Sequence, residues 1–292
     1  MSRTKKVTEP SPAPRNIENC EGRMKWQAEI GEPVESLPAP STYRLRRRTP
    51  GSFVLVSCPQ IGRALKCQGQ LEAATAVILA GCPEVQSVRE QPAKIWYSWH
   101  ENADELNVQI LDAPQQIARG RNATRHVSYV VPDFLVRLTN RRVHLIEVKP
   151  SRRLEDPIVQ RKLCASRTYA DDQGWSFHVL TEEHLVGGSL VRNLRLLARY
   201  RHLQAEAQEL AALESRVPPQ GRTLMDLCDG ETSGAQVRVH LFHLLAMHRL
   251  SFDPRSRPLD KATKIFPGGV ITWNPFDSVW APNGCSTGGL SV

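Results

Sequence analysis

The sequence predicts a mixed α/β fold, and three stretches of the chain support this prediction. The first is an Ala-, Leu- and Glu-rich helical pattern over residues 70–79. The second is a pair of β-rich runs, 130–138 and 143–149, on either side of a short polar turn. The third is a helix that begins at Asp156-Pro157, an N-cap followed by proline at the first helical position, and leads to a strand over 175–180. Strand, hairpin, helix and strand in this order are typical of an α/β core with a crossover connection.

Length and composition limit the possible classes of protein. The chain has 292 residues, enough for about two domains, and 40% hydrophobic content supports a buried core. A net charge of +8 excludes an acidic disordered activator and makes a polyanionic partner worth testing. The N-terminus is polar and no apolar run approaches the roughly 20 residues that span a bilayer, so we expect a cytoplasmic protein. The seven cysteines form no C-x-x-C pair, which indicates neither a zinc site nor a disulfide framework.

The N-terminal fifty residues differ in composition from the rest of the chain. Residues 1–50 contain seven of the 21 prolines and ten Lys or Arg against six acids. This composition predicts a flexible basic arm, which is either a solvated tail or a DNA-binding arm. After it, residues 53–56, 95–97 and 106–111 are candidate strands.

The C-terminal part reads as mainly helical. Gly187-Gly188 is a plausible joint, and a long helical pattern over 190–213 follows it. Two shorter helical patterns, 223–228 and 233–249, precede a Pro-, Arg- and Lys-containing loop over 251–264. Helices followed by a basic loop resemble a winged-helix domain. We therefore predict a basic arm at 1–50, an α/β domain at 51–186, a winged-helix-like domain at 189–266 and a disordered tail at 267–292.

Two acids and a lysine form the most informative pattern in the sequence. Asp133 lies at the start of one hairpin strand, and Glu147 and Lys149 lie two residues apart in the other, which puts them on one face. Two carboxylates in a cleft suit Mg²⁺, and a neighbouring lysine can stabilise charge on a phosphate under attack. The alternative is a solvated hairpin face with a weak Glu–Lys pair. Residues 119–162 carry eleven Lys or Arg against four acids, which favours a site that attracts a DNA backbone.

The shared face imposes a condition on the register of the hairpin. Opposite residues of an antiparallel pair face the same side, so Asp133 and Glu147 share a face only if paired numbers have an even sum. A two-residue turn at Asn140-Arg141 would pair Thr139 with Arg142 and give an odd sum. The sequence therefore predicts a three- or five-residue turn, or a bulge near Asp133.

At these residues the chain resembles a known group of nucleases. Asp133, Glu147 and Lys149 resemble the P-D-(D/E)-x-K restriction-endonuclease-like superfamily. More narrowly, residues 72–185 resemble the TnsA endonuclease subunit of heteromeric transposases. The motifs that carry this likeness are Cys82-Pro83-Glu84-Val85, Glu90-Gln91-Pro92, Pro132-Asp133-Phe134-Leu135-Val136, Glu147-Val148-Lys149-Pro150 and Phe177-His178-Val179-Leu180-Thr181-Glu182.

The resemblance implies a fold, a site and a reaction. The fold would be a restriction-endonuclease-like mixed sheet flanked by helices, and the second domain would be a winged helix. The catalytic residues would be Glu72, Asp133, Glu147 and Lys149, with Glu72, Asp133 and Glu147 as ligands of Mg²⁺, for which Mn²⁺ can substitute. From position alone, Glu72 is equally an ordinary acid in the first turn of a helix.

The implied reaction is metal-dependent hydrolysis of phosphodiester bonds. The protein would cleave the 5′ ends of a transposon in cut-and-paste transposition, acting on double-stranded DNA at the transposon ends. Its partners would be a separate recombinase, which cuts and joins the 3′ ends, and an ATP-dependent regulator. The alternatives are a stand-alone restriction or repair endonuclease, and a non-catalytic DNA- or partner-binding adaptor with the same fold.

Overall fold

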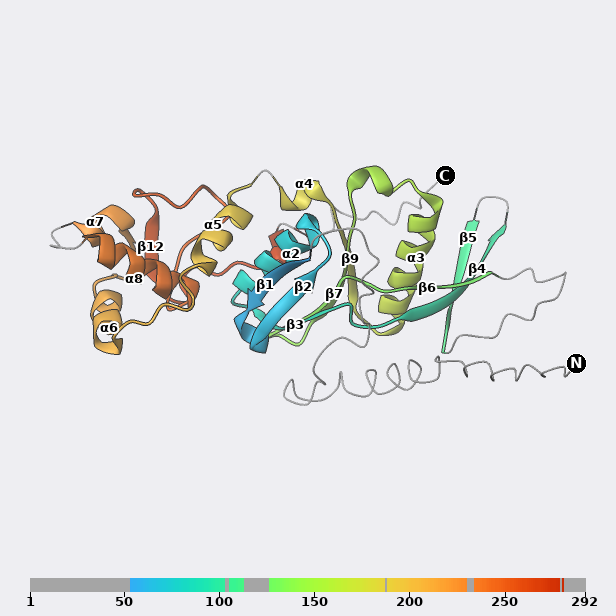
Figure 1. Cartoon of the computed structure of the whole chain (residues 1–292), viewed down its shortest axis with the longest axis horizontal. Helices are drawn as coiled ribbons and strands as arrows, with labels where there is room; N and C mark the ends of the chain where they lie inside the picture. The colour runs from blue at the N-terminus through green and yellow to red at the C-terminus, as the bar shows by residue number, and fades with distance from the viewer. Residues whose placement is uncertain are drawn as a thin grey trace, which may run out of the picture.

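The computed structural model describes most of the chain beyond the N-terminal arm. The described residues are 53–102, 105–112, 126–186, 188–229, 234–278 and 280. The predicted basic arm at 1–50 lies outside this range. Figure 1 shows an elongated arrangement in which the sheets and the two longest helices of the α/β part lie at one end and helices α6 to α8 at the other.

A four-stranded mixed sheet forms the centre of the α/β part. Its order is β3-β7-β8-β9, with β3 (Val85–Glu90), β7 (Phe134–Leu138), β8 (Val143–Val148) and β9 (Ser176–Leu180). Strands β8 and β9 are parallel, and helix α3 (Pro157–Asp172) connects them. The side chain of Asp156 caps α3 by accepting a hydrogen bond from the N–H of Ile158. The predicted α/β core with a crossover helix is confirmed.

Each face of this sheet is covered by one helix, because alternate residues of its strands point to opposite sides (Figure 1). Helix α2 (Gln70–Gly81) covers the face that carries Phe134, Val136, Ile146 and Val148. Helix α3 covers the face that carries Leu135, Val143, Leu145 and Phe177. The sequence prediction that a helix covers Ile146 and Val148 is therefore confirmed.

Two smaller sheets extend the α/β part. The hairpin of β1 (Val54–Cys58) and β2 (Arg63–Cys67) packs on α2. The sheet β5-β4-β6, made of β4 (Ile95–Asn102), β5 (Glu105–Leu111) and β6 (His126–Val130), packs on α3. Its strands β4 and β6 lead directly from β3 and into β7, so the two sheets meet beside residues 91–94 and 131–133.

The register of the β7–β8 hairpin meets the predicted condition. Phe134 pairs with Ile146 and Leu135 with Leu145, so paired numbers sum to 280, an even value. The turn has three residues, since the N–H of Leu138 donates to the carbonyl of Arg142 at 2.9 Å. Arg141 closes it in the left-handed region with φ of 67°, as three-residue hairpin turns require. The ladder extends to the Phe134–Ile146 pair, directly beside Asp133, and the predicted three-residue turn is confirmed.

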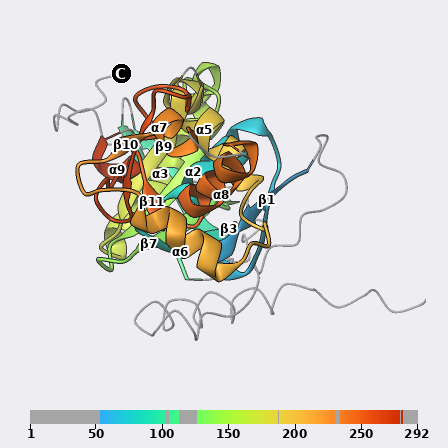
Figure 2. The same cartoon turned by 90° about the vertical axis from the view of Figure 1, so that its left-hand side faces the viewer.

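The C-terminal part consists of short helices and a small sheet. Its elements are α4 (Glu182–Leu185), α5 (Ser189–Ala198), α6 (Ala207–Ser215), α7 (Leu224–Cys228) and α8 (Gly234–Ala246), with a sheet of order β10-β12-β11 (Arg222–Thr223, Lys264–Pro267 and Leu250–Ser251). Figure 2 shows α6 and α8 in front of α2 and β3. No helix in the described part of the chain is long and apolar enough to cross a membrane.

The predicted single helix over 190–213 is wrong, since the structure has two helices there, α5 and α6, with a non-helical connection between them. Residues between α5 and α6 instead place the buried side chain of Arg201 against the α/β part. Its guanidinium donates to the carbonyl of Ser57 at 3.2 Å and to that of Ala80 at 2.8 Å. Helical periodicity alone does not show this break, since the contacts that cause it come from residues more than a hundred positions away.

The predicted boundaries around 187 and 267 do not separate independent cores. Leu190 and Leu194 of α5 are buried in the core of α2 and the central sheet, whereas Leu197 belongs to the core of the C-terminal helices. The predicted disordered tail is wrong for residues 267–278 and 280, and residues 281–292 lie outside the described chain. Trp273 and Phe276 are buried in the first core together with Trp280.

Two buried histidines fasten this segment to the central sheet. The rings of His144 and His178 are joined by a hydrogen bond of 3.0 Å, and His178 Nδ1 lies 3.2 Å from the carbonyl oxygen of Trp280. Since a carbonyl only accepts, His178 donates from Nδ1. Burial lowers the pKa of both rings, which favours their neutral forms and leaves His178 Nε2 to accept from His144 Nδ1. The ring of His144 also stacks on Phe276 at a centroid distance of 3.8 Å.

We expect this pair to make the fold acid-sensitive. Burial, then the neighbouring His178 and Arg142, lowers the pKa of His144 to about 3, and burial also lowers the pKa of His178. The unfolded chain therefore binds protons first, so the contribution of this pair to stability should fall as pH drops below about 6.5, by up to ~1.4 kcal/mol per pH unit for each proton. Urea unfolding at several pH values tests this.

A matched pair of variants isolates the contribution of the buried ring. His144→Phe keeps a ring against Phe276 and should flatten the pH dependence, whereas His100→Asn, at an exposed position on β4, should leave it unchanged. Equal acid sensitivity in His144→Phe and the unaltered chain would contradict the assignment.

Candidate active site

The four residues predicted for the site come from three elements of the α/β part. Asp133 directly precedes β7, Glu147 lies in β8 and Lys149 follows that strand. Glu72 lies in the first turn of α2. The β7–β8 ladder ends at Phe134–Ile146, which brings Asp133 next to the end of β8, and period-two alternation puts Glu147 and Lys149 on one face.

Backbone and side-chain hydrogen bonds hold Asp133 in place. Its N–H donates to the carbonyl of Ile146 at 3.1 Å, and its carbonyl accepts from the N–H of Gln91 at 2.8 Å. Its carboxylate Oδ2 accepts from the N–H of Val148 at 2.7 Å. The carboxylate is therefore fixed against the end of β8, next to Lys149.

The ammonium of Lys149 lies among three oxygen atoms. Its Nζ is 2.5 Å from Glu147 Oε1 and 3.4 Å from Asp133 Oδ2, and it donates to the carbonyl of Val148 at 3.1 Å. Glu147 is buried, with 2% of its surface exposed, and Asp133 and Lys149 are largely buried. The alternative of a solvated hairpin face is therefore wrong for these three residues.

The buried charges shift one another's proton affinity. Burial, followed by the charge of Asp133, raises the pKa of Glu147 to about 8. Burial lowers the pKa of Lys149, but the negative charges of Asp133 and Glu147 have a larger combined effect and raise it above its usual value. Lys149 therefore stays protonated at neutral pH. Glu147 needs a nearby positive charge to stabilise its ionised form.

Glu72 interacts with the site through its charge. Burial, then the carboxylate of Asp133, raises the pKa of Glu72 to about 7, and Lys149 partly opposes this shift. Its Oε2 accepts a hydrogen bond of 2.7 Å from the N–H of Gln68, just before α2. The structure thus brings Asp133, Glu147 and Lys149 into contact and places Glu72 within their electrostatic reach.

The oxygen atoms of this site fit a hard cation. Among the described residues no three His, Cys, Asp or Glu side chains approach closely enough to form a ready metal site. However, Glu147 Oε2 is buried without a hydrogen-bond partner, and three oxygens already surround a positive charge at Lys149 Nζ. Carboxylate and carbonyl oxygens are the ligands that Mg²⁺ prefers. Asp133 and Glu147 are therefore the residues that can hold such an ion.

Sequence reasoning assigned no role to two residues that position the site. Glu90 is buried, and its carboxylate accepts hydrogen bonds from both terminal guanidinium nitrogens of Arg63, at 2.6 and 2.7 Å. This ion pair connects β2 to β3. Gln91 follows in the left-handed region with φ of 48° and directs its N–H to Asp133. The motif Glu90-Gln91-Pro92 contributed to the resemblance to the TnsA family, but the sequence did not indicate the contacts of its residues with Arg63 and Asp133.

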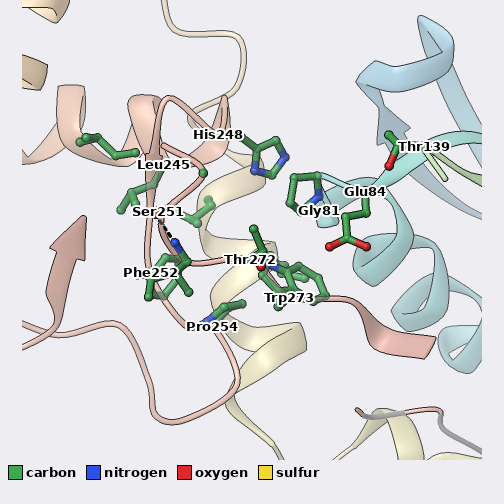
Figure 3. Close-up of a pocket in the computed structure, with 16 residues that line it drawn as sticks. Gly81, Glu84, Thr139, Leu245, His248, Ser251, Phe252, Pro254, Thr272 and Trp273 are labelled. Atoms are coloured by element: carbon green, nitrogen blue, oxygen red, sulfur yellow. Dashed lines mark hydrogen bonds between the residues drawn. The ribbon is translucent and has the colours of Figure 1, made fainter. Parts of the chain in front are cut away.

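The cavity shown in Figure 3 is a separate feature. It has a volume of about 280 Å³ and lies between Gly81 and Glu84 of the α/β part and His248 and Phe252 of the C-terminal part. None of the four predicted site residues lines it. The cavity is therefore distinct from the candidate site at the end of β8.

The comparison with known families agrees with this geometry. Residues 82–182, about a third of the chain, match the family model described as TnsA-like endonuclease N terminal. The match includes Asp133, Glu147 and Lys149, and Glu72 lies ten residues before it. No curated protein matches the sequence.

Proposed function

We propose that this chain, which carries a TnsA-like endonuclease N-terminal domain over residues 82–182, is the DNA-cutting subunit of a heteromeric transposase. It would hydrolyse phosphodiester bonds at the 5′ ends of the element with Mg²⁺ as cofactor. Its partners would be a recombinase that cuts and joins the 3′ ends and an ATP-dependent regulator. The C-terminal helices and small sheet would form a winged-helix-like unit.

The observation that carries this proposal is the contact of Asp133, Glu147 and Lys149 within the matched region. Two carboxylates and a lysine meet at the end of β8, and one carboxylate oxygen is buried without a partner. An adaptor that only binds DNA has no need to bury this carboxylate, since a buried carboxylate oxygen without a hydrogen-bond partner is costly. The arrangement therefore supports a catalytic role.

The residues of the chain would divide the chemistry among them. Asp133 and Glu147 would hold Mg²⁺, which supplies a lowered pKa for bound water and neutralises charge on the phosphate. Lys149, protonated at neutral pH, would donate to a non-bridging phosphate oxygen and stabilise the charge that develops there. Glu72, whose pKa of about 7 lies near working pH, is suited to accept the proton of the attacking water or to complete the ion's ligands.

A cleavage assay tests the proposal most directly. The full-length protein is incubated with double-stranded DNA that carries the transposon end, with Mg²⁺ or EDTA, and with or without the recombinase subunit proposed as its partner. We expect cuts at the 5′ ends that require both Mg²⁺ and the recombinase. Cleavage at defined sites without the recombinase would indicate a stand-alone nuclease, and no cleavage in any combination would contradict the proposal.

Glu72→Gln should lose most cleavage with little change in melting temperature. The substitution keeps the hydrogen-bond acceptor for Gln68 but removes the carboxylate that interacts with Asp133 and Lys149. Calorimetric titration with Mg²⁺ separates the two roles, because a ligand loses affinity for the ion and a proton acceptor does not. Cleavage by Glu72→Gln at the rate of the unaltered chain would remove Glu72 from the site.

Lys149→Ala should slow cleavage while largely sparing Mg²⁺ affinity, because the ammonium stabilises charge and is not a ligand of the ion.

A further inference from the structure

A basic turn follows the lysine of the candidate active site. The chain continues from Lys149 through Pro150 into a 3₁₀ turn, η3 (Ser151–Arg153), in which Arg152 and Arg153 are exposed. Arg152 lies three residues from Lys149, so their Cα atoms are at most about 11 Å apart. Arg152 is thus exposed in the turn that follows the site, and Arg153 beside it pairs with Asp156 at 3.2 Å.

Glu182 holds this turn with both of its carboxylate oxygens. Ser151 donates its N–H to Oε2 at 2.9 Å and its hydroxyl to Oε1 at 2.6 Å. These hydrogen bonds, and more weakly the charge of Arg152, keep the pKa of Glu182 below its usual range. Glu182 is itself fixed, because it opens α4 directly after Thr181, whose side chain forms a capping box with His184.

Hydrogen bonds therefore join the end of β8 to the start of α4. The N–H of Lys149 donates to the carbonyl of Leu180 at 2.9 Å, two residues before Glu182. The path from Glu182 to Ser151 closes a ring of contacts around Lys149 and Pro150. A carboxylate at this position would repel an approaching phosphate, and its two hydrogen bonds to Ser151 give it a structural use in holding the turn.

We propose that the turn Ser151–Arg153 is a phosphate-binding surface that grips the DNA backbone next to the cleaved bond, with Glu182 as the positioning residue that holds it. The inference rests on the proposed function, because DNA is the substrate assumed there. The chemistry that recognises this partner is charge-assisted hydrogen bonding from arginine to phosphate, with no readout of bases.

DNA binding measured apart from cleavage tests this surface. The full-length chain carrying Glu147→Gln is titrated against a fluorescent double-stranded oligonucleotide at several salt concentrations, and polarisation reports binding. In this background Arg152→Ala is compared with Glu182→Ala, Glu182→Gln and Glu183→Ala. Glu183 is the matched control, since it is the next residue of α4 and is exposed.

The three glutamate variants separate positioning from charge. If charge alone mattered, each loss of one negative charge would leave binding equal or tighter. We expect Glu182→Ala to weaken binding by about threefold to tenfold, because the turn loses both hydrogen bonds that hold it and the arginine contact with phosphate, worth about one hydrogen bond, is no longer positioned. Glu182→Gln should keep binding, because its amide can still accept from the Ser151 N–H and pair with the hydroxyl. Glu183→Ala should bind as tightly as the parent or tighter.

The arginine provides an independent measurement. Arg152→Ala should weaken binding and lower the slope of log affinity against log salt by about one. Equal binding by Arg152→Ala and the parent, equal binding by Glu182→Ala and Glu183→Ala, or no DNA binding by the parent would each overturn the proposal. If the binding pattern holds but the unaltered chain cuts no DNA, the proposed function fails while this surface stands.

Discussion

Replacing either strand carboxylate should abolish cleavage while leaving the fold intact. Glu147→Gln removes a charge from a side chain with 2% exposure, and Asp133→Asn keeps an oxygen that can accept from the Val148 N–H. We expect cleavage to fall by more than about 100-fold in each, beyond the range seen when only a supporting contact of a metal ligand is lost. The measurement is the rate of DNA cutting together with the melting temperature and the calorimetric affinity for Mg²⁺.

A neighbouring carboxylate offers a matched control for this experiment. Glu155 lies exposed between η3 and α3 in the same basic segment, so Glu155→Gln makes the same chemical change outside the site. This variant should cut DNA at the rate of the unaltered chain. Cleavage at that rate by Glu147→Gln would contradict the assignment of the active site. A large drop in its melting temperature would show that Glu147 acts through stability instead.

Shortening the chain should unfold the α/β part, although the sequence predicted a separate α/β domain at 51–186. A chain that ends at residue 186 loses Leu190, Leu194, Trp273, Phe276 and Trp280, all of which are buried in that core. Truncating one large buried aromatic residue typically costs about 3–5 kcal/mol, and whole domains are stable by only about 5–15 kcal/mol. We therefore expect no cooperative thermal transition by circular dichroism.

Two further end points locate the effect. A chain that ends at residue 267 keeps the C-terminal helices but lacks the three aromatic residues, and it should also fail to fold cooperatively. A chain that ends at residue 280 keeps every described residue and should melt at the temperature of the full-length chain. A cooperative transition at that temperature for the chain ending at 186 would show that the shared core is not required.

The hairpin at the site was predictable because its determinants are local. Period-two alternation fixes which residues share a face, and the need for Asp133 and Glu147 to meet excluded a two-residue turn. The three-residue turn closed by Arg141 satisfies this condition. The N-cap at Asp156 and the crossover helix α3 were also legible, since capping and proline placement act within a few residues.

The contribution of the C-terminal segment was not predictable from its composition. Residues after 267 are rich in Gly and Ser, which suggested disorder, yet Trp273, Phe276 and Trp280 fill the core beside α2. Their burial depends on a surface formed by residues that lie more than a hundred positions earlier in the chain. The aromatic residues were visible in the sequence, but the surface that covers them was not.

The sequence by itself determined the central strands, the crossover helix and the trio of Asp133, Glu147 and Lys149, because spacing along a strand fixes which side chains meet. Only the tertiary structure decided how deeply Glu147 is buried, how Gln91 orients Asp133 and how Glu182 holds the turn after Lys149. These contacts join elements that are distant in sequence. Their strength depends on exclusion of water and on distances of about 3 Å, which exist only after the helices and sheets have packed.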